Sequence, residues 1–301
     1  MLSPMPRFGP AGIPTITKPK DVVKGIEDVR ELGLDLMELE FVYGVWIQNN
    51  EKGLKKAEEI KNKSKELDVV LTAHAPYFIN LASQDQKKVK ASIQRIVECA
   101  RASHWVGAKY VVTHLGYYGK LSKEEAYEVV KKNLEEIVEI IRDRGYKVYI
   151  SPETLGKISQ FGSLEEVVSL CEEVDGLWPT IDFAHLHART GGGYKDKSAY
   201  ERTLDYIEEH LGSDVVKRLH IHFSGIEYGE KGEKKHLILK HADISFEDLA
   251  EVLVDRGLTE VTIVSESPIL EQDALLMKQI YEEILRKKGS KNERKNSCPC
   301  S

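Results

Sequence analysis

Histidines and carboxylates recur at the downstream ends of short apolar runs in this sequence. Residues 69–74 end in His74, residues 110–114 in His114 and residues 148–153 in Glu153. Residues 180–185 hold Asp182 and His185, residues 219–222 end in His222, and residues 261–266 end in Glu266. If these runs are parallel strands of a closed barrel, their carboxyl ends meet at one rim. Because imidazoles and carboxylates together bind divalent metal ions, the pattern predicts a metal site there.

The carboxylates carry more of this prediction than any single histidine. A lone histidine at a strand end is more often a hydrogen-bonded core residue than a metal ligand. A buried, ionised carboxylate is costly unless a cation or good donors offset its desolvation. No Lys or Arg occurs in the strand ends that carry Glu153, Asp182 and Glu266. We therefore expect two or three divalent ions among these carboxylates and the neighbouring histidines.

Short β-branched runs alternate with amphipathic segments of helical length, as in chains of βα units. The predicted strands are 7–9, 35–41, 69–75, 110–114, 147–153, 178–183, 216–223 and 260–266. The predicted helices are 21–32, 52–67, 86–106, 123–143, 164–174, 198–210, 246–255 and 272–286. Eight such units predict an α/β protein, a (β/α)8 TIM barrel.

Local signals refine the helix starts and the connections. Three capping boxes are predicted, Ser122 with Glu125, Ser163 with Glu166 and Ser245 with Asp248. Residues 183–197 and 223–244 show no clear element and are expected to be long rim loops, where barrels place their chemistry.

Composition limits the class of protein. The 301-residue chain has a formal net charge of -6, so DNA binding would need a local basic patch or the metal cluster itself. Without a membrane-length apolar stretch or a secretory signal pattern, we expect a soluble, cytoplasmic protein and no membrane partner. We expect one domain over residues 1–287 and a disordered polar tail over residues 288–301. Cys99 and Cys171 fit buried helix positions, whereas a disulfide or metal role stays open for Cys298 and Cys300 in the tail.

Taken in order, the motifs resemble those of endonuclease IV, the zinc-dependent apurinic/apyrimidinic endonuclease family, within the xylose-isomerase-like TIM barrels. The matching segments are His74-Ala-Pro-Tyr77-Phe78, Thr113-His114-Leu-Gly116, Glu153-Thr-Leu-Gly156 and Asp182-Phe-Ala-His185, followed by His222 and Glu266. The resemblance covers residues 7–286. Each motif alone is weak, but the ordered set is specific.

The resemblance implies a role for each matching residue. Glu153 would be the catalytic, bridging glutamate, and two zinc ions would bind the set His74, His114, Glu153, Asp182, His222 and Glu266. A third zinc would bind His185 and His236, and manganese is an alternative metal. The implied protein is a monomer that cleaves double-stranded DNA 5' to abasic sites, with metal-activated hydroxide attacking phosphorus. Tyr77 and Phe78 would fill the gap that the extruded sugar leaves in the base stack.

Two segments depart from the family pattern. The family completes its third zinc site with an Asp-x-His pair, whereas Lys234 stands at the aspartate position here and Glu233 could substitute as a ligand. The family's second βα loop carries an arginine that probes the DNA, but residues 40–46 contain no arginine. Glu38 and Glu40 would add negative charge near the rim, which weighs against DNA.

Two alternatives to a nuclease remain. A sugar isomerase or epimerase of the related barrels would bind one Mn, Mg or Zn ion through Glu153, Asp182, His222 and Glu266. The additional histidines at positions 74, 114, 185 and 236 favour a multinuclear hydrolase, because imidazole-rich clusters select zinc-like metals. A degenerate, ligand-binding barrel is disfavoured because no ligand of the first two metals is missing.

Some charged and polar residues near the expected site have a simpler interpretation. We expect local hydrogen bonding for His187 and His220, and solvated surface charge for Lys157, Arg189 and Lys195.

Overall fold

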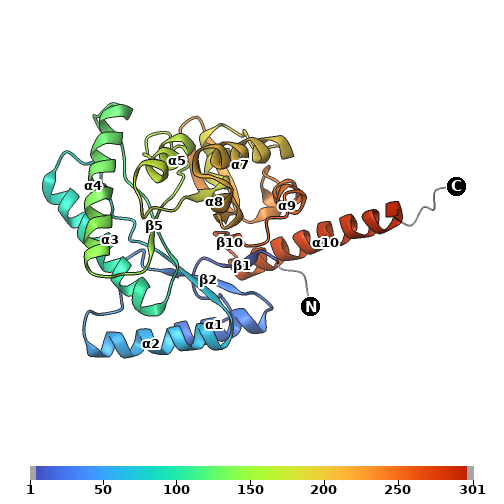
Figure 1. Cartoon of the computed structure of the whole chain (residues 1–301), viewed down its shortest axis with the longest axis horizontal. Coiled ribbons are helices and arrows are strands. Elements are labelled where there is room, and N and C mark those ends of the chain that lie inside the picture. The colour runs from blue at the N-terminus through green and yellow to red at the C-terminus, as the bar shows by residue number, and fades with distance from the viewer. Residues whose placement is uncertain (1–4, 297–301) are drawn as a thin grey trace.

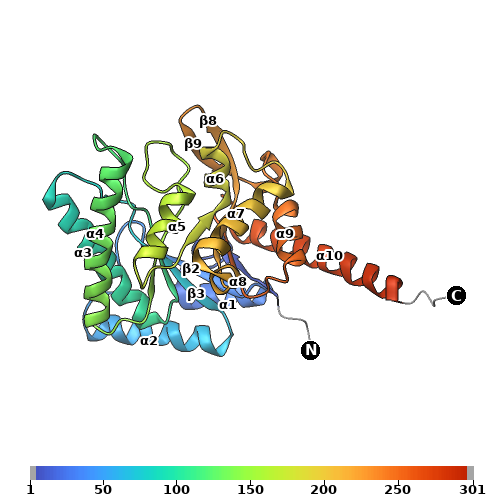
Figure 2. The ribbon, with the colours of Figure 1, turned by 45° about the horizontal axis from the view of Figure 1, so that its top comes forward.

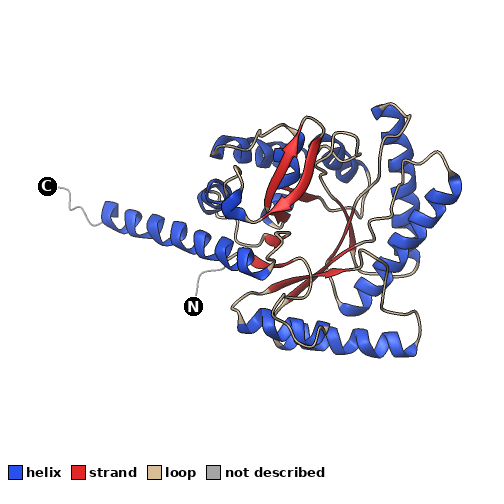
Figure 3. Cartoon of the chain, turned by 180° about the vertical axis from the view of Figure 1, so that it is seen from behind, coloured by secondary structure: helices blue, strands red, loops and turns tan. Residues whose placement is uncertain are grey.

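The computed structural model describes residues 5–296 and contains a closed barrel of eight parallel strands, ringed by helices (Figure 1, Figure 3). In order around the barrel these are β1 (Arg7–Pro10), β2 (Leu36–Glu40), β3 (Val70–His74), β4 (Tyr110–Thr113), β5 (Tyr149–Pro152), β6 (Thr180–Asp182), β7 (His220–Phe223) and β10 (Thr262–Ser265). Two ladders, β2-β3-β4-β5 and β6-β7-β10-β1, are joined by parallel bridges from Ala11 to Glu38 and from Glu153 to Thr180. The predicted (β/α)8 TIM barrel and all eight of its predicted strands are confirmed.

The helices that cover the barrel also follow the prediction. They are α1 (Val22–Glu31), α2 (Glu51–Glu66), α3 (Gln86–Val106), α4 (Lys123–Asp143), α5 (Leu164–Glu173), α7 (Lys197–Leu211), α9 (Phe246–Asp255) and α10 (Glu271–Asn296). Complete capping boxes form at Ser122 and Ser163. At Ser245 only the serine half forms, with its hydroxyl accepting from the Asp248 amide at 3.3 Å, because aspartate is one methylene shorter than the glutamate of a full box.

Both long connections contain structure that the prediction missed. Residues 183–197 begin with the helix α6 (Phe183–Arg189), and α8 (Ser213–Lys217) precedes β7. Residues 223–244 form the antiparallel hairpin of β8 (Gly225–Gly229) and β9 (Gly232–Leu237), followed by the 3-10 helix η1 (Leu239–His241). Figure 2 shows this hairpin beside α6, at one end of the barrel.

Part of the segment predicted as a disordered tail, residues 288–296, belongs to the last helix. Helix α10 continues without interruption to Asn296, because Lys, Glu and Arg are good helix formers. Cys298 and Cys300 lie outside the described residues. Within the described residues, no helix is both long and apolar enough to cross a membrane.

Because successive side chains of a strand point to opposite faces, the site residues on the strands point into the barrel. In β7, Phe223 packs against Phe246 of α9 with ring centroids 5.1 Å apart, so its face of the strand points outward. His220 and His222 therefore point into the barrel, because residues two apart share a strand face. Both histidines are fully buried.

The closure between β1 and β2 depends on a glycine. A Cβ atom at Gly9 would lie 1.7 Å from the carbonyl oxygen of Leu36.

We expect Gly9→Ala to reduce the free energy of unfolding by at least about 2 kcal/mol, because the strand would have to move away from β2. Urea unfolding followed by circular dichroism measures this. Gly289→Ala is the control: no atom lies within 4 Å of its added Cβ, so it should unfold at or above the wild-type urea concentration. Equal midpoints for Gly9→Ala and wild type would contradict this account.

Candidate metal centre

Glu153, which directly follows β5, lies at the centre of a cluster of imidazoles and is fully buried. Its Oε2 atom lies 2.9 Å from His114 Nε2 and 3.4 Å from His74 Nε2. Its Oε1 atom lies 3.2 Å from His222 Nδ1 and 3.4 Å from His185 Nδ1. Burial alone would raise the pKa of Glu153, but the imidazoles, His114 first among them, hold that pKa well below its ordinary value. Each oxygen of this carboxylate therefore faces a different group of ligands.

The first group is His74, His114 and Glu153, whose ligand atoms lie within 4.8 Å of one another. His74 ends β3, and its Nδ1 atom lies 2.8 Å from the carbonyl oxygen of Ala75. A carbonyl can only accept, so this bond assigns the proton to Nδ1 and leaves Nε2 free toward Glu153. The Tyr77 ring covers this group, stacked on His114 with ring centroids 5.5 Å apart.

The second group is Glu153, Asp182, His222 and Glu266. Asp182 ends β6 and is also the N-cap of α6, where its Oδ1 atom accepts from the His185 amide at 2.7 Å. The other oxygen, Oδ2, is buried and has no hydrogen-bond partner. Burial raises the pKa of Asp182 to about 8. The Asp-x-x-His spacing thus makes one carboxylate cap a helix and aim its second oxygen at the cluster.

The third group is His185, Glu233 and His236. The Nε2 atoms of His185 and His236 face each other at 3.3 Å, and Glu233 Oε2 lies 3.7 Å from His185 Nε2. Both outer nitrogens already have partners: His185 Nδ1 lies 2.9 Å from the Thr154 carbonyl oxygen, and His236 Nδ1 lies 2.7 Å from Ser224 Oγ. The two Nε2 atoms share a hydrogen bond in this structure, and both would face a common cation beside the Glu233 carboxylate once His185 lost its proton.

A β-bulge explains how Glu233 reaches this group despite the altered spacing. In the hairpin, Tyr228 pairs with Glu233 and Glu227 pairs with Lys235, so Lys234 is an extra residue in β9. Residues three apart in a regular strand face opposite sides, but a bulge adds one residue and restores a common side. Glu233 and His236 therefore share a face.

The hairpin is also fixed to the loop after β5. The Glu233 amide donates to the Gly156 carbonyl at 3.1 Å, and a Cβ atom at Gly156 would lie 2.6 Å from that of Glu233. The glycine of the Glu153-Thr-Leu-Gly156 motif therefore leaves room for the third group.

Glu38, on β2, is a functional candidate that the sequence reasoning placed wrongly. It does not lie at the rim but is fully buried in the barrel. Its Oε2 atom accepts from Thr72 Oγ1 at 2.7 Å and contacts His220 Nε2 at 3.1 Å, and its Oε1 atom lies 3.1 Å from His222 Nε2. Burial would raise the pKa of Glu38, but His222 and His220 lower it. A glutamate inside an apolar strand was the signal, since a buried carboxylate needs partners.

The composition of the cluster fits divalent ions. Among the described side chains, no Lys or Arg forms an ion pair with Glu153, Asp182 or Glu266, so the carboxylates are balanced only by imidazoles. The unpartnered Asp182 Oδ2 atom is the kind of buried group that a cation satisfies. Mixed imidazole and carboxylate ligands suit zinc and, less well, manganese.

The structure also places the remaining aromatic, histidine and lysine residues that the sequence analysis singled out. Tyr77 and Phe78 are 49% and 65% exposed at the rim. His187 and His220 form hydrogen bonds, but with residues that are distant in the sequence, Asp243 and Glu38. Lys195 is exposed and lies 3.8 Å from Asp243.

The prediction of surface charge was wrong for Arg189. Its guanidinium donates to the carbonyl oxygens of Leu155, Lys157 and Gln160 and to the Tyr118 hydroxyl. It therefore holds the loop after β5, and Lys157 on that loop lines the pocket over the metal centre.

Fold and site together define a TIM-barrel protein with a cluster of histidines and carboxylates that could hold metal ions at the carboxyl ends of its strands. The chain belongs to the xylose isomerase-like TIM barrel family, whose model matches residues 26–285.

Curated relatives agree with the resemblance to endonuclease IV. An uncharacterized protein of Methanocaldococcus jannaschii is 39% identical over 279 residues, or 92% of this chain and 97% of the relative. A probable endonuclease 4 of Mycoplasma mobile is 29% identical over 231 residues, covering 75% of this chain and 79% of the relative.

Solved structures with this fold include both enzyme classes. Endonuclease IV from Thermus thermophilus superposes with a TM-score of 0.68 at 18% identity, covering 94% of this chain and all of that one. A D-tagatose 3-epimerase-like protein gives 0.65 at 23% identity, covering 89% of this chain and 97% of that one. These identities show the shared fold and do not separate a nuclease from an epimerase.

Glu38 should act on the metal centre through His222. We expect Glu38→Gln to weaken zinc binding about 10- to 100-fold, because the outer carboxylate orients the imidazole and raises its basicity. Competition with a chromogenic chelator measures the affinity. Glu51→Gln, at an exposed position on α2, is the control, and it should bind zinc as the wild type does. Equal affinities for all three proteins would show that Glu38 has no such role.

Zinc binding to the metal-free protein should release protons. Burial lowers the pKa of His74, but the hydrogen bond to Glu153 and the negative charges of Glu153, Glu40 and Glu38 together outweigh burial and raise the pKa to about 10. This histidine is therefore protonated at pH 7 and must lose its proton to become a ligand, so zinc affinity should rise as the pH rises toward 10. Titration calorimetry in buffers of different ionisation enthalpy gives the number of protons released. A binding enthalpy that is independent of the buffer would contradict the prediction.

Proposed function

We propose that this protein is a metal-dependent phosphodiesterase of the endonuclease IV type, which cleaves DNA 5' to abasic sites. The observation that carries the proposal is the presence of ligands beyond those that one ion needs. Glu153, Asp182, His222 and Glu266 would suffice for the single ion of an isomerase. The structure adds the group of His74 and His114 on the other oxygen of Glu153, and the group of His185, Glu233 and His236.

Three adjacent groups match the chemistry of phosphodiester hydrolysis. Divalent ions held there would lower the pKa of water, orient the phosphate and offset the charge that develops on its oxygens. Glu153 is suited to serve two ions at once, because its two oxygens face different groups. The bulged hairpin then supplies Glu233 and His236 at the same mouth.

A pocket lies above the cluster and could hold part of the substrate. It has a volume of about 300 Å³, and its walls include Tyr77, Tyr117, Lys157 and Gln160. We assign the Tyr77 ring, stacked on His114, to the deoxyribose that has left the base stack. Lys157 offers a cation for a flanking phosphate. An extruded sugar without a base is the cheapest nucleotide to place there, because little stacking is lost.

The direct test uses a labelled duplex that carries one tetrahydrofuran abasic analogue. We expect the zinc-loaded protein to nick it on the 5' side of the lesion, to lose this activity on chelation and to regain it with zinc. Glu153→Ala should lose both the activity and the bound metal, because this carboxylate belongs to two ligand groups. Gel electrophoresis and zinc content per chain are the measurements.

His114→Asn separates the nuclease from the isomerase. His114 lies only in the first ligand group and its side chain is 20% exposed, so the fold should survive its replacement. A multinuclear nuclease should lose nicking, whereas a single-ion isomerase would keep its turnover. No nicking by the wild type with zinc or manganese, together with interconversion of ketoses, would refute the proposal in favour of the epimerase class.

A further inference from the structure

The aromatic residues Tyr77 and Phe78 face two different pockets. The Tyr77 ring lines the pocket over the metal centre and lies against His74 and His114. The Phe78 ring lines a second pocket, on the outer side of the same loop. Since adjacent Cα atoms are only about 3.8 Å apart, one short segment connects the two pockets. A strand that reaches the metal centre can therefore place a neighbouring nucleotide at the second pocket.

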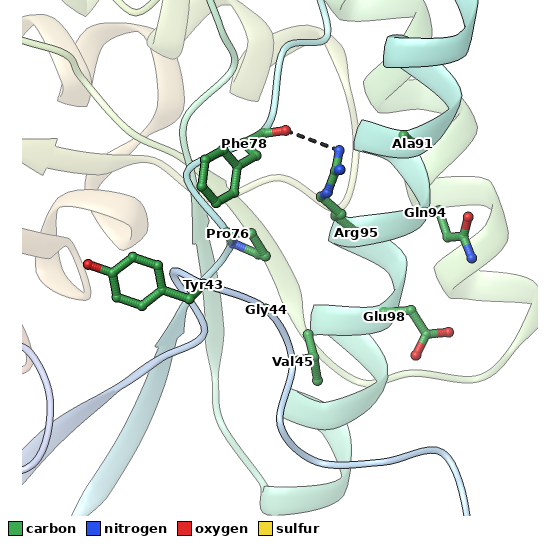
Figure 4. A pocket seen from close by; sticks show the side chains of 9 residues that line it. All are labelled: Tyr43, Gly44, Val45, Pro76, Phe78, Ala91, Gln94, Arg95 and Glu98. Atoms are coloured by element: carbon green, nitrogen blue, oxygen red, sulfur yellow. Dashed lines mark hydrogen bonds between the residues drawn. The ribbon is translucent and has the colours of Figure 1, made fainter.

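The second pocket, which we call the rim slot, has a volume of about 330 Å³. Figure 4 shows that its walls come from three segments: the loop after β2 with Tyr43 and Val45, the loop after β3 with Pro76 and Phe78, and helix α3. Tyr43 is 89% exposed and Phe78 is 65% exposed. Two rings held open to solvent beside an apolar wall are suited to a flat, partly apolar ligand.

The polar side of the rim slot offers donors and little free negative charge. Arg95 lies at its edge, where the guanidinium donates to the Phe78 carbonyl at 3.2 Å (Figure 4). The carboxylate among the lining residues, Glu98, pairs with Arg101 at 3.1 Å. The slot thus combines aromatic surface with a guanidinium, which is the combination that stacks nucleic acid bases.

A local basic surface continues from the rim slot along α3. Lys87, Lys88 and Lys90 are exposed in its first turns, and none of them forms an ion pair among the described side chains. Lys87 and Lys90 lie one helical turn before Ala91 and Gln94, which line the slot. In a chain with a net charge of -6, this run is the local cationic patch that DNA binding requires.

We propose that the rim slot binds one nucleobase of the DNA substrate, displaced from its stack beside the abasic site, while the lysines of α3 contact the adjoining phosphates. Tyr43, in the loop after β2, contacts the base by stacking. This inference rests on the proposed function, because the base reaches the slot only when the neighbouring phosphodiester lies at the metal centre.

The test measures binding of the pre-nicked product duplex, which cannot be hydrolysed again. We expect Tyr43→Ala to weaken binding of the zinc-loaded protein about tenfold, as for the loss of one stacked base. Tyr43→Phe keeps the ring and should bind as the wild type does. The same measurements are repeated on duplexes that lack one base at a time near the nick. At one position, removal of the base should abolish the difference between Tyr43→Ala and wild type.

The lysines are tested through the salt dependence of the same binding. Replacing Lys87, Lys88 and Lys90 together by Gln should reduce the slope of log affinity against log salt by about 2 to 3, one phosphate for each lysine. The control replaces three exposed lysines on other helices, Lys65, Lys132 and Lys217. It changes the net charge equally and should leave the slope unchanged.

The outcomes separate this inference from the proposed function. If Tyr43→Ala binds the duplex as tightly as the wild type, the proposal for the rim slot is wrong. It is also wrong if the loss of affinity in Tyr43→Ala persists whichever base is removed. Both results hold even if the protein nicks DNA. A change from dimer to monomer in Tyr43→Ala, with DNA binding intact, assigns the slot to a second copy and also overturns the inference. If removal of one base abolishes the effect of Tyr43→Ala but the protein does not nick DNA, the base-binding role of the rim slot is supported and the nuclease activity is refuted. No DNA binding by the wild type refutes both.

Discussion

The balance of charge inside the barrel is the constraint on which the rest of this structure depends. Glu153, Asp182 and Glu266 lie at strand ends away from bulk water, and desolvation of an ionised carboxylate is costly. Among the described side chains only imidazoles form ion pairs with them, and one oxygen of Asp182 has no hydrogen-bond partner. Divalent cations would satisfy both the charge and the missing contacts. The surrounding fold positions the candidate ligands around the sites that those ions would occupy.

A few local features of the backbone position these side chains. Parallel strands bring His74, Glu153 and His222 to one rim, and strand alternation keeps them inside the barrel. A helix that starts immediately after Asp182 turns the next ligand, His185, toward the same mouth. The bulge at Lys234 returns Glu233 and His236 to a common face. Buried Glu38 lies behind His222, with its Oε1 atom 3.1 Å from His222 Nε2.

The barrel, and the meeting of most candidate ligands at one rim, could be predicted because each depends on short-range patterns. Alternating strand and helix periodicities define the units, and ligands at strand ends follow from the fold. Glu233 was expected as a substitute ligand, but the bulge that brings it to the third group could not be predicted, because a bulge depends on how two strands pair and not on the sequence of one of them. Arg189 and Glu38 were misplaced for a similar reason: their partners, the carbonyls after β5 and the histidines of β7, are distant in the sequence. Helix α6 was missed because it is shorter than the helices that periodicity can detect.

The central claim is that divalent ions hold these carboxylates and imidazoles together. Crystals grown with zinc and measured on both sides of its absorption edge test it most directly, since anomalous scattering locates the metal without assumptions about activity. We predict anomalous peaks between Glu153 and the pair of His74 and His114, and among Glu153, Asp182, His222 and Glu266, with a further peak beside His185 and His236. An ordered structure with these side chains turned away from one another and no anomalous peak among them would contradict the account.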